Sequence, residues 1–461
     1  MKKPVLLLAL LLFAFYSQSC SSTKKTVEEP QNIILDIQTE NIPEQKAFIT
    51  DMDNEHYQIK KISDNHFADT LKLPEGYYKI NIGNEYSNIY LKPGMNLKIY
   101  VDGNQFDETI RYEGTGAEIN NLMAAQMLDN ENFKEQHKPK QLAMLSEEEF
   151  LKLVDSVYQA KLKKLEQLPL QDSKFKEMEA KKYLIEKNSA TSMYPLYRQY
   201  FSGKEYKPGE NYPEALEGLD IKDPQLIKIP GYLDLVQNSL YKDIPAEKMK
   251  EDYMLALVLT AEEKLTDNPQ LKEIIMARLA KSGLNRTKNI DEYYKIIDRN
   301  VSDAKLKSEL EKTYKTLKKV QAGNPSPDFT AYDINGKEYH LSDFKGKNLY
   351  IDLWATWCGP CLMEGPYLEK LKKDYEGKNI EIVSIDVFDD KARWEKMVKS
   401  GKLSGVQLII PDRDADFLLL YNVTSIPRFI FIDKNGNIID NNAPRPSSPQ
   451  IRNLIDKYLA E

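Results

Sequence analysis

The chain has 461 residues, of which 41% are hydrophobic and 29% charged, and it contains 28 tyrosines. This length is too great for one ordinary hydrophobic core and indicates about three domains. The net charge of −7, without a basic stripe that alternates with aromatic residues, argues against a nucleic-acid partner.

The first 19 residues have the pattern of an export signal peptide. A charged start at residues 1–3 precedes an apolar run at residues 5–16, which is too short to cross a bilayer as a permanent helix. Cys20 follows in a serine-rich context that resembles a bacterial lipoprotein signal, in which the cysteine becomes the lipidated first residue. Ser17 departs from that pattern, because an aliphatic residue is usual at its place. The alternative is an ordinary signal peptide followed by a stray cysteine.

The lipoprotein resemblance implies a location in the cell envelope. The protein would face the periplasm at the outer membrane and be held there by lipid on Cys20. The polar residues 20–32 are expected to form a flexible tether. No other run approaches the ~20 apolar residues of a membrane helix, so the lipid would be the whole anchor.

Residues 33–112 are predicted to form a small antiparallel β-sandwich. Short segments of alternating polarity are separated by turn residues, which is the spacing of such a fold. The expected strands are residues 33–37, 46–50, 77–82, 89–91 and 97–101.

Residues 113–322 carry helical signals and are predicted to form an all-α region. Ser146 and Glu149 make a capping box ahead of one amphipathic run, and Asp303 opens another. The tyrosine-rich stretch 194–201 is expected to pack in the core rather than to form a partner-binding groove. Helix breaks are expected at Pro169, Pro195, Pro208, Pro213, Pro230 and Pro269.

A linker at residues 323–327 leads into residues 323–461, where strands alternate with helices. This alternation is the pattern of an α/β domain. Asn335 and Gly336 mark a hairpin near its start. The expected strands are residues 348–354, 380–387, 407–410, 428–432 and 438–439, and the expected helices are residues 362–375, 392–400, 414–421 and 449–459.

Two of the three cysteines, Cys358 and Cys361, lie where a buried strand is predicted to pass into a helix. At a helix start the free N–H groups and the positive end of the dipole favour a thiolate, which is the nucleophilic form of cysteine. Cys361, one turn further on, is then placed to resolve a mixed disulfide.

The cysteine pair has two other possible interpretations, a zinc site and a structural disulfide. Zinc is disfavoured, because the only other cysteine is Cys20 and the nearest histidine is His340. A structural disulfide stays an alternative, although so short a loop gains little stability from closure. If Cys20 carries lipid, the pair holds the only free thiols of the chain.

The stretch 354–361, Trp-Ala-Thr-Trp-Cys-Gly-Pro-Cys, together with Ser-Ile-Pro at residues 425–427, resembles the thioredoxin fold. An extra helix and strand within the α/β region, and Glu364 shortly after the second cysteine, are similar to the TlpA/ResA branch of thiol–disulfide oxidoreductases. Residues 33–112 in turn resemble the β-rich module that precedes such domains in many Bacteroidota lipoproteins. The expected fold is therefore multidomain: an N-terminal β-sandwich, a central all-α region and a C-terminal α/β thioredoxin fold at residues 323–461.

The resemblance implies roles for residues outside the cysteine motif. Asp352, on the central strand, would be a buried carboxylate that takes the proton of Cys361 during resolution. An exposed aspartate is the alternative, and the strand at residues 381–384 offers no lysine to tune it. Pro427 would follow a cis peptide bond and place the backbone of Ile426 opposite the dithiol, where it could pair with a substrate. A trans edge-strand proline is the alternative.

Residues around the cysteines are expected to contact the substrate and to set the direction of the reaction. Trp357, Gly359 and Pro360 would lie at the substrate surface. Glu364 either belongs to the redox site or is a first-turn glutamate favoured by the helix dipole, and both interpretations stay open. Gly359-Pro360, and Ile426 in place of a threonine, resemble reducing thioredoxins and predict a reductant.

The predicted function is a cell-envelope thiol–disulfide oxidoreductase. It would reduce exported proteins with oxidised cysteines, with apocytochromes c as one candidate class, and draw electrons from an unidentified envelope donor. The Cys358–Cys361 pair would be the redox centre, without a further cofactor or a metal. A peroxiredoxin-like peroxidase is the nearest enzymatic alternative, although that family has a different cysteine context. The non-enzymatic alternative is a lipid-anchored binding protein with an auxiliary thioredoxin-like domain.

Overall fold

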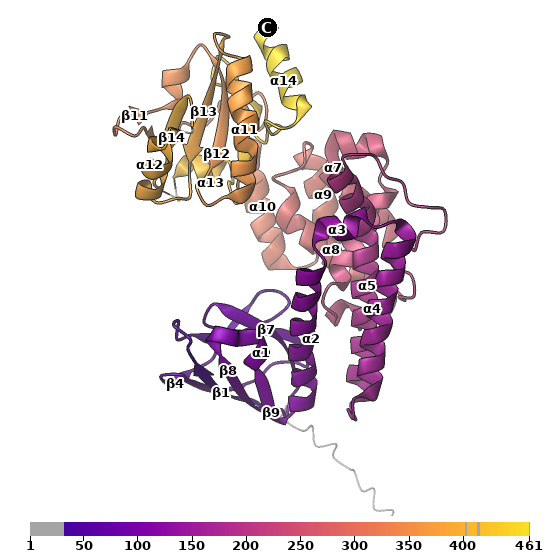
Figure 1. Cartoon of the computed structure of the whole chain (residues 1–461). Helices are drawn as coiled ribbons and strands as arrows, with labels where there is room; N and C mark the ends of the chain where they lie inside the picture. Colours follow the sequence, from indigo (N-terminus) through magenta and orange to yellow (C-terminus); the bar gives the residue numbers. More distant parts are fainter. Residues whose placement is uncertain (1–31, 402, 413–414, 461) are drawn as a thin grey trace, which may run out of the picture.

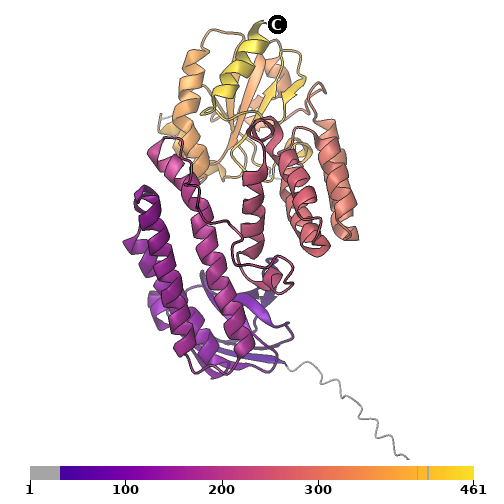
Figure 2. The ribbon, with the colours of Figure 1, turned by 90° about the vertical axis from the view of Figure 1, so that its right-hand side faces the viewer.

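The structure is a computed structural model that describes residues 32–401, 403–412 and 415–460. Figure 1 shows a β-rich N-terminal part at the bottom, a bundle of helices beside and above it, and an α/β part at the top. In Figure 2 the chain rises from the β-rich part through the helices to the α/β part. The predicted signal peptide and Cys20 lie outside the described residues, as does all of the predicted tether except Asn32.

The N-terminal part consists of two sheets, ordered β4-β5-β1-β8-β9 and β3-β2-β6-β7. Alternate residues of β1 are buried, as expected for a strand with one face on the core. The elements are β1 (Ile33–Glu40), β2 (Ala47–Thr50), β3 (His56–Gln58), β4 (Lys61–Ser63), β5 (His66–Leu71), β6 (Gly76–Ile82), β7 (Glu85–Leu91), β8 (Asn96–Asp102), a 3-10 turn (Gly103–Gln105), α1 (Phe106–Thr109) and β9 (Arg111–Thr115).

The prediction of wholly antiparallel strands is wrong, because β1 runs parallel to β8. Four strands, β3, β4, β5 and β9, were not predicted. Their sequences carry little apolar alternation, and β4, Lys-Ile-Ser, is exposed throughout. The last of them, β9, ends at Thr115 and so crosses the expected boundary at residue 112.

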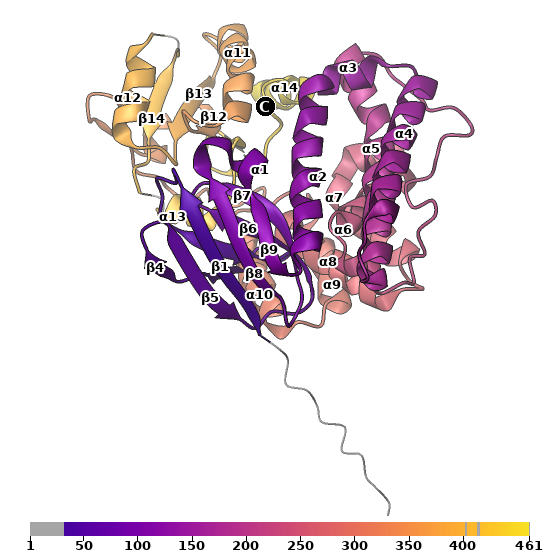
Figure 3. The same cartoon turned by 60° about the horizontal axis from the view of Figure 1, so that its bottom comes forward.

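Two consecutive asparagines of helix α2 (Ala117–Gln136) cover edge strands of both sheets. Asn120 accepts a hydrogen bond from the N–H of Tyr90 in β7 at 2.8 Å and donates to its carbonyl at 3.0 Å. Asn121 makes the same pair of bonds with Tyr112 in β9, both at 2.9 Å. Each carboxamide takes the place of a further strand on an edge whose backbone groups would otherwise lack partners. Figure 3 shows α2 along this side of the two sheets.

The central part is all-α, as predicted. The capping box is confirmed, since Ser146 N–H donates to the Glu149 carboxylate at 2.9 Å and Glu149 N–H donates to the Ser146 hydroxyl at 3.3 Å. No helix in the described part of the chain is long and apolar enough to cross a membrane. The remaining helices are α3 (Pro139–Met144), α4 (Glu147–Gln167), α5 (Ser173–Ser202), α6 (Tyr232–Leu240), α7 (Ala246–Lys264), α8 (Pro269–Gly283), α9 (Ile290–Asn300) and α10 (Ala304–Lys319), with 3-10 turns at Leu226–Lys228 and Tyr241–Asp243.

The prediction of a break at Pro195 is wrong, because this proline lies inside α5. Proline lacks the N–H that would bond the carbonyl four residues earlier, here that of Thr191. The hydroxyl of Tyr212 donates to this carbonyl at 2.7 Å instead. The acceptor that proline leaves free is therefore satisfied from outside the helix, and α5 continues.

The tyrosine-rich stretch 194–201 packs in the core only in part. Tyr194 is buried and stacks on Phe150 with ring centroids 4.3 Å apart. Tyr197 and Tyr200, three and six residues later on the same helix, are 46% and 74% exposed. The expectation of core packing is therefore wrong for these two rings.

The C-terminal part has a seven-stranded sheet in the order β11-β10-β14-β13-β12-β15-β16. Strand β12 is central, parallel to β13 and antiparallel to β15, and every one of its residues is buried. The elements are β10 (Ala331–Tyr332), β11 (Glu338–Tyr339), a 3-10 turn (Leu341–Phe344), β12 (Asn348–Trp354), α11 (Gly359–Asp374), β13 (Ile380–Asp386), α12 (Lys391–Lys399), β14 (Val406–Ile409), α13 (Asp416–Leu420), β15 (Arg428–Ile432), β16 (Ile438–Asp440) and α14 (Pro449–Ala460).

The predicted linker at residues 323–327 joins the helices to the α/β part but is not loose. The N–H of Gly323 donates to the carbonyl of Ile438 at 2.8 Å, and that of Ser326 donates to Gly436 at 2.9 Å. The linker thus runs beside the β15–β16 hairpin as a short extra pairing segment.

Candidate active site

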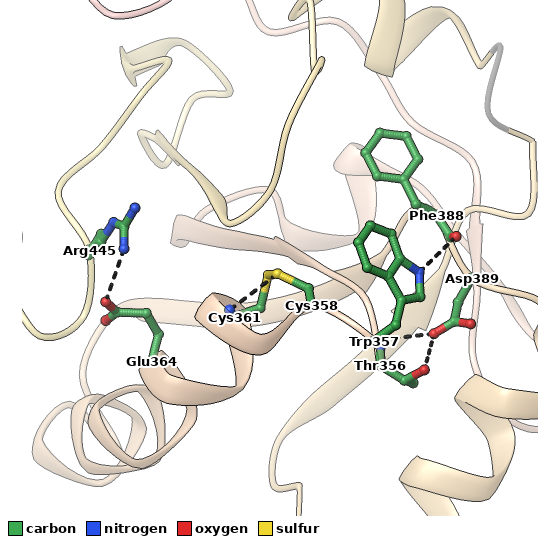
Figure 4. Close-up of a disulfide and its surroundings, with 8 residues drawn as sticks. All are labelled: Thr356, Trp357, Cys358, Cys361, Glu364, Phe388, Asp389 and Arg445. Atoms are coloured by element: carbon green, nitrogen blue, oxygen red, sulfur yellow. Dashed lines mark hydrogen bonds and ion pairs between the residues drawn. A yellow bond between two sulfur atoms is a disulfide. The ribbon is translucent and has the colours of Figure 1, made fainter. Parts of the chain in front are cut away.

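The two cysteines form a disulfide at the junction of β12 and α11 (Figure 4). Their sulfur atoms are 2.01 Å apart, and the side chains are 3% and 7% exposed. Cys358 is the N-cap of α11, and its sulfur accepts a hydrogen bond from the N–H of Cys361 at 3.2 Å. The predicted strand-to-helix junction is confirmed. An N–H group aimed at this sulfur stabilises a thiolate there once the disulfide is reduced.

Asp352 lies on β12 and is buried, with 8% of its surface exposed. The alternative of an exposed aspartate is therefore wrong. Burial raises the pKa of this carboxyl to about 7. Its proton can then be both taken up and released near neutral pH, which suits a proton carrier.

The charge that tunes Asp352 comes from helix α11 rather than from a neighbouring strand. Lys372 lowers the pKa of Asp352 through its positive charge, and Ser384, opposite Asp352 on β13, lowers it through a hydrogen bond. The Lys372 ammonium donates to Glu369 at 3.0 Å and to the carbonyl of Ser404 at 2.7 Å. The neighbouring strand offers no lysine, as the sequence indicated, and Lys372 acts on Asp352 because α11 packs on the sheet.

A second buried carboxyl, Asp386, was not predicted. It stands opposite Trp354 at the end of β13 and is completely buried. Burial, followed by repulsion from Asp389, raises its pKa to about 7. Its Oδ1 accepts from the N–H of Asp389 at 3.1 Å, while Oδ2 has no hydrogen-bond partner among the described residues. The only sequence signal of this buried carboxyl was the position of Asp386 at the end of an apolar strand.

The loop that leads into the first cysteine is held by the loop after β13 (Figure 4). Thr356 donates its N–H to Oδ2 of Asp389 at 2.8 Å, and its hydroxyl donates to the same oxygen. The indole N–H of Trp357 donates to the carbonyl of Phe388 at 3.3 Å. The Trp357 side chain is nevertheless 57% exposed, so it is held in place beside the disulfide and still faces solvent.

Replacing Asp389 by alanine is expected to loosen this loop. The variant removes the acceptor of both Thr356 bonds, and a hydrogen bond to a charged group contributes about 1.5–3 kcal/mol. Amide hydrogen exchange at Thr356 should be at least about tenfold faster in the folded protein. Asp389→Asn keeps one oxygen acceptor, so its exchange rate at Thr356 should lie between those of the wild type and Asp389→Ala. Equal exchange rates in all three proteins would contradict the assignment.

Glu364 is bound across the site to the segment that precedes α14. Its carboxylate accepts from the N–H of Ser447 at 3.0 Å and from the Ser447 hydroxyl at 2.9 Å, with Arg445 at 3.7 Å. Its charge also raises the pKa of Asp352, after the larger effect of burial. Glu364 lies beyond the first turn of α11, so its interpretation as a first-turn glutamate is wrong, and its role in redox tuning stays a prediction.

The peptide bond between Ile426 and Pro427 is cis, as predicted. Ile426 packs against the buried cluster that contains both cysteines. Gly359 and Pro360 are exposed at the first turn of α11. The residues expected to contact the substrate therefore surround the disulfide, as Figure 4 shows for Trp357.

Comparisons with known proteins match this same part of the chain. The family model described as Redoxin matches residues 321–455. The thiol-disulfide oxidoreductase ResA of Geobacillus kaustophilus is 37% identical over 119 residues, which cover 26% of this chain and 67% of that protein. The chain belongs to the ResA family of thiol–disulfide oxidoreductases. The ResA of Bacillus thuringiensis is 31% identical over 141 residues, which cover 31% of this ResA-family chain and 78% of its relative.

Solved structures include a similar chain, the thioredoxin domain of a thiol-disulfide oxidoreductase from Bacteroides vulgatus. It is 27% identical, and the match covers 30% of this chain and 97% of that one with a TM-score of 0.28. The Redoxin match and the relatives named ResA show that this chain is a thioredoxin-like thiol–disulfide oxidoreductase, and they do not favour the peroxidase alternative. The Redoxin model matches the C-terminal part, and the two ResA relatives cover 26% and 31% of this chain.

Proposed function

We propose that this protein reduces disulfide bonds of exported proteins through Cys358 and Cys361. The observation that carries the proposal is a disulfide at the start of α11, with the buried carboxyl of Asp352 on the preceding strand and Ile426 packed against the cysteine cluster. This set supplies a nucleophile, a proton carrier and a backbone edge for an extended substrate.

The reaction begins with the reduced pair. The Cys358 thiolate attacks one sulfur of the substrate disulfide, a mixed disulfide forms, and the other substrate sulfur leaves as a thiolate that takes a proton. Cys361 then gives its proton to Asp352 and attacks the Cys358 sulfur, which releases the second substrate sulfur. Two electrons pass from the cysteine pair to the substrate, and an envelope thiol donor returns the pair to its reduced form.

Direction and location belong to the same proposal. Gly359-Pro360 and Ile426 resemble reducing thioredoxins, which supports reduction over oxidation. The predicted signal peptide and lipid on Cys20 would place the reaction on the periplasmic side of the envelope, at the outer membrane. Exported proteins with oxidised cysteines, including apocytochromes c, are the proposed substrate class. The cysteine pair itself carries the electrons.

Trapping substrates in the full-length protein tests this function. Cys361→Ser keeps the attacking thiol and removes the resolving one, so mixed disulfides with envelope proteins should accumulate through Cys358. They should appear as reductant-sensitive bands on non-reducing gels. Cys358→Ser is the matched control and should trap far less.

Two results would contradict the proposal. The first is that Cys361→Ser traps no envelope protein. The second is that the double variant Cys358→Ser/Cys361→Ser retains the full cellular role of the protein, which would move the function to binding by residues 32–320. Peroxide consumption faster than any dithiol exchange would favour the peroxidase alternative.

A further inference from the structure

One loop of the helical part, residues 283–288, begins at the last residue of α8 and contacts the α/β part of the chain. Asn285 of this loop exchanges hydrogen bonds with Asn422, which donates from its side chain to the Asn285 side-chain oxygen at 2.8 Å. The Asn285 amide donates to the Asn422 carbonyl at 3.4 Å. The backbone carbonyl of Asn285 accepts from Arg428 at 3.4 Å and from Asn442 at 3.3 Å.

These bonds hold both ends of one short segment. Asn422 begins it and Arg428 ends it, and between them lie Ile426 and Pro427. Ile426 packs on the cluster that contains the two cysteines, and Arg428 stands opposite Leu353 near the end of β12. A single residue of the helical part is therefore bonded to both ends of the segment that forms the proposed substrate edge.

The loop itself is rigidly supported from within the helical part. The Asp252 carboxylate sits at a kink in α7 and accepts from the Thr287 hydroxyl at 2.7 Å. The same oxygen accepts from the N–H groups of Lys288 at 2.7 Å and Asn289 at 3.1 Å. At the other end, Gly283 has no room for a side chain, because an added Cβ would lie 1.8 Å from the Tyr293 hydroxyl.

The α/β side of this contact is equally constrained. Arg428 is 7% exposed, and its guanidinium donates to the Asn441 carbonyl at 2.9 Å as well as to Asn285. A buried cation needs such acceptors, because burial without them is costly. Asn422 has a positive φ of 47°, a conformation that asparagine and glycine adopt more readily than other residues.

We infer that Asn285 is a positioning residue for the substrate edge, so that the helical part helps this enzyme to bind disulfide-bonded polypeptides. The inference rests on the proposed reductase function. By fixing both ends of the segment, the 283–288 loop orders the Ile426 backbone before the substrate arrives, which lowers the entropy lost on binding. A small disulfide needs only the cysteine pair and would not benefit from this order.

Two disulfide substrates, each added to the reduced full-length protein, distinguish reduction of a polypeptide disulfide from reduction of a small one. Insulin supplies disulfides within a polypeptide, and 5,5′-dithiobis(2-nitrobenzoic acid) is a small-molecule disulfide. Asn285→Ala should lower the second-order rate constant for insulin by about fivefold, the equivalent of one net hydrogen bond. The rate constant for the small disulfide should stay within about twofold of the wild-type value, because this probe does not need the ordered Ile426 segment. A twofold change corresponds to a free energy well below that of one net hydrogen bond. Asn238→Ala, at an exposed site on α6, is the matched control and should change neither rate.

A second variant tests the bond from the other side. Asn422→Gly keeps access to positive φ but removes the side chain that donates to Asn285. It should slow insulin reduction in the same way, and the double variant should be no slower than the slower single one, because both remove the same contact. Additive losses, or equal losses with both probes, would overturn the inference. Failure of the reductase proposal itself would be seen differently, as a wild-type protein that does not reduce insulin.

Discussion

Replacing Asp352 by asparagine is expected to slow the resolution of mixed disulfides by about 10²-fold or more, the range typical for loss of a general base. The variant is nearly isosteric but cannot take the proton of Cys361. Attack by Cys358 on a substrate should change much less, because its thiolate is stabilised at the start of α11. Rapid-quench measurement of mixed-disulfide decay would separate the two steps.

The pH dependence of resolution gives an independent check of the same residue. Asp352 accepts a proton only when ionised, and burial raises its pKa to about 7, so the wild-type rate should rise as pH increases through 7. Asp386 has a pKa of about 7 as well, and the wild-type profile alone cannot assign the step. Asp352→Asn should remove the rise and Asp386→Asn should retain it. The reverse pattern would assign the base to Asp386.

The Asp352→Asn variant should be more stable than the wild type, although it is less active. The pKa of Asp352 in the folded protein is about 7, above its value of 3.8 in the unfolded chain, so the folded state binds this proton more tightly. The stability that this group contributes is full below pH 4 and is lost as pH rises through 7. Asp352→Asn should therefore raise the free energy of unfolding by up to ~4 kcal/mol at pH 8 and by little at pH 4. A slower but more stable variant excludes misfolding as the cause of the lost activity.

The redox motif could be predicted closely because its signals are local. Cys358 and Cys361, the strand before them and the helix after them occupy one short stretch, and β12 was predicted with its observed ends. Burial of Asp352 was predicted from the family resemblance and is confirmed. The cis bond before Pro427 followed from the family resemblance.

The partners of these residues could not be predicted, since they come from elements that folding brings together. Lys372 acts on Asp352 from α11, and Asp389 binds Thr356 from the loop after β13. Asn285 reaches the substrate edge from a different part of the chain. None of these contacts has a fixed spacing in the sequence, so no motif reports them.

The elements of the fold that were predicted wrongly also depend on residues distant in the sequence. Pro195 was predicted to end a helix because proline removes a donor, but Tyr212 supplies the missing bond from a separate loop. Strands such as β4 lack apolar alternation and exist because a neighbouring strand pairs with them. In both cases a distant partner outweighs the local preference.

The largest stability loss is expected from breaking a buried ion pair within α5, on the side of this helix that contacts the sandwich and α2. Lys182 and Glu179 form this pair with side chains that are 7% and 0% exposed. Tyr77 of β6 donates to Glu179 at 2.9 Å, and Lys182 donates to Gln126 of α2 at 3.0 Å. Lys182→Met leaves the Glu179 charge buried without its cation, which costs about 3–5 kcal/mol. For the folding unit that contains the sandwich and the helices packed on it, the calorimetric Tm should fall by about 10 °C.

A second lysine of the same helix provides the control. Lys174 also joins α5 to the sandwich, through Glu75 at 2.6 Å, but its side chain is 53% exposed. Solvent screens such a pair, so Lys174→Met should cost no more than about 1 kcal/mol. Lys182→Met/Glu179→Gln removes both charges and should recover much of the loss, because the cost lies in the unpaired charge rather than in the missing attraction. Equal losses for Lys182→Met and Lys174→Met would show that burial of the pair does not set its energy.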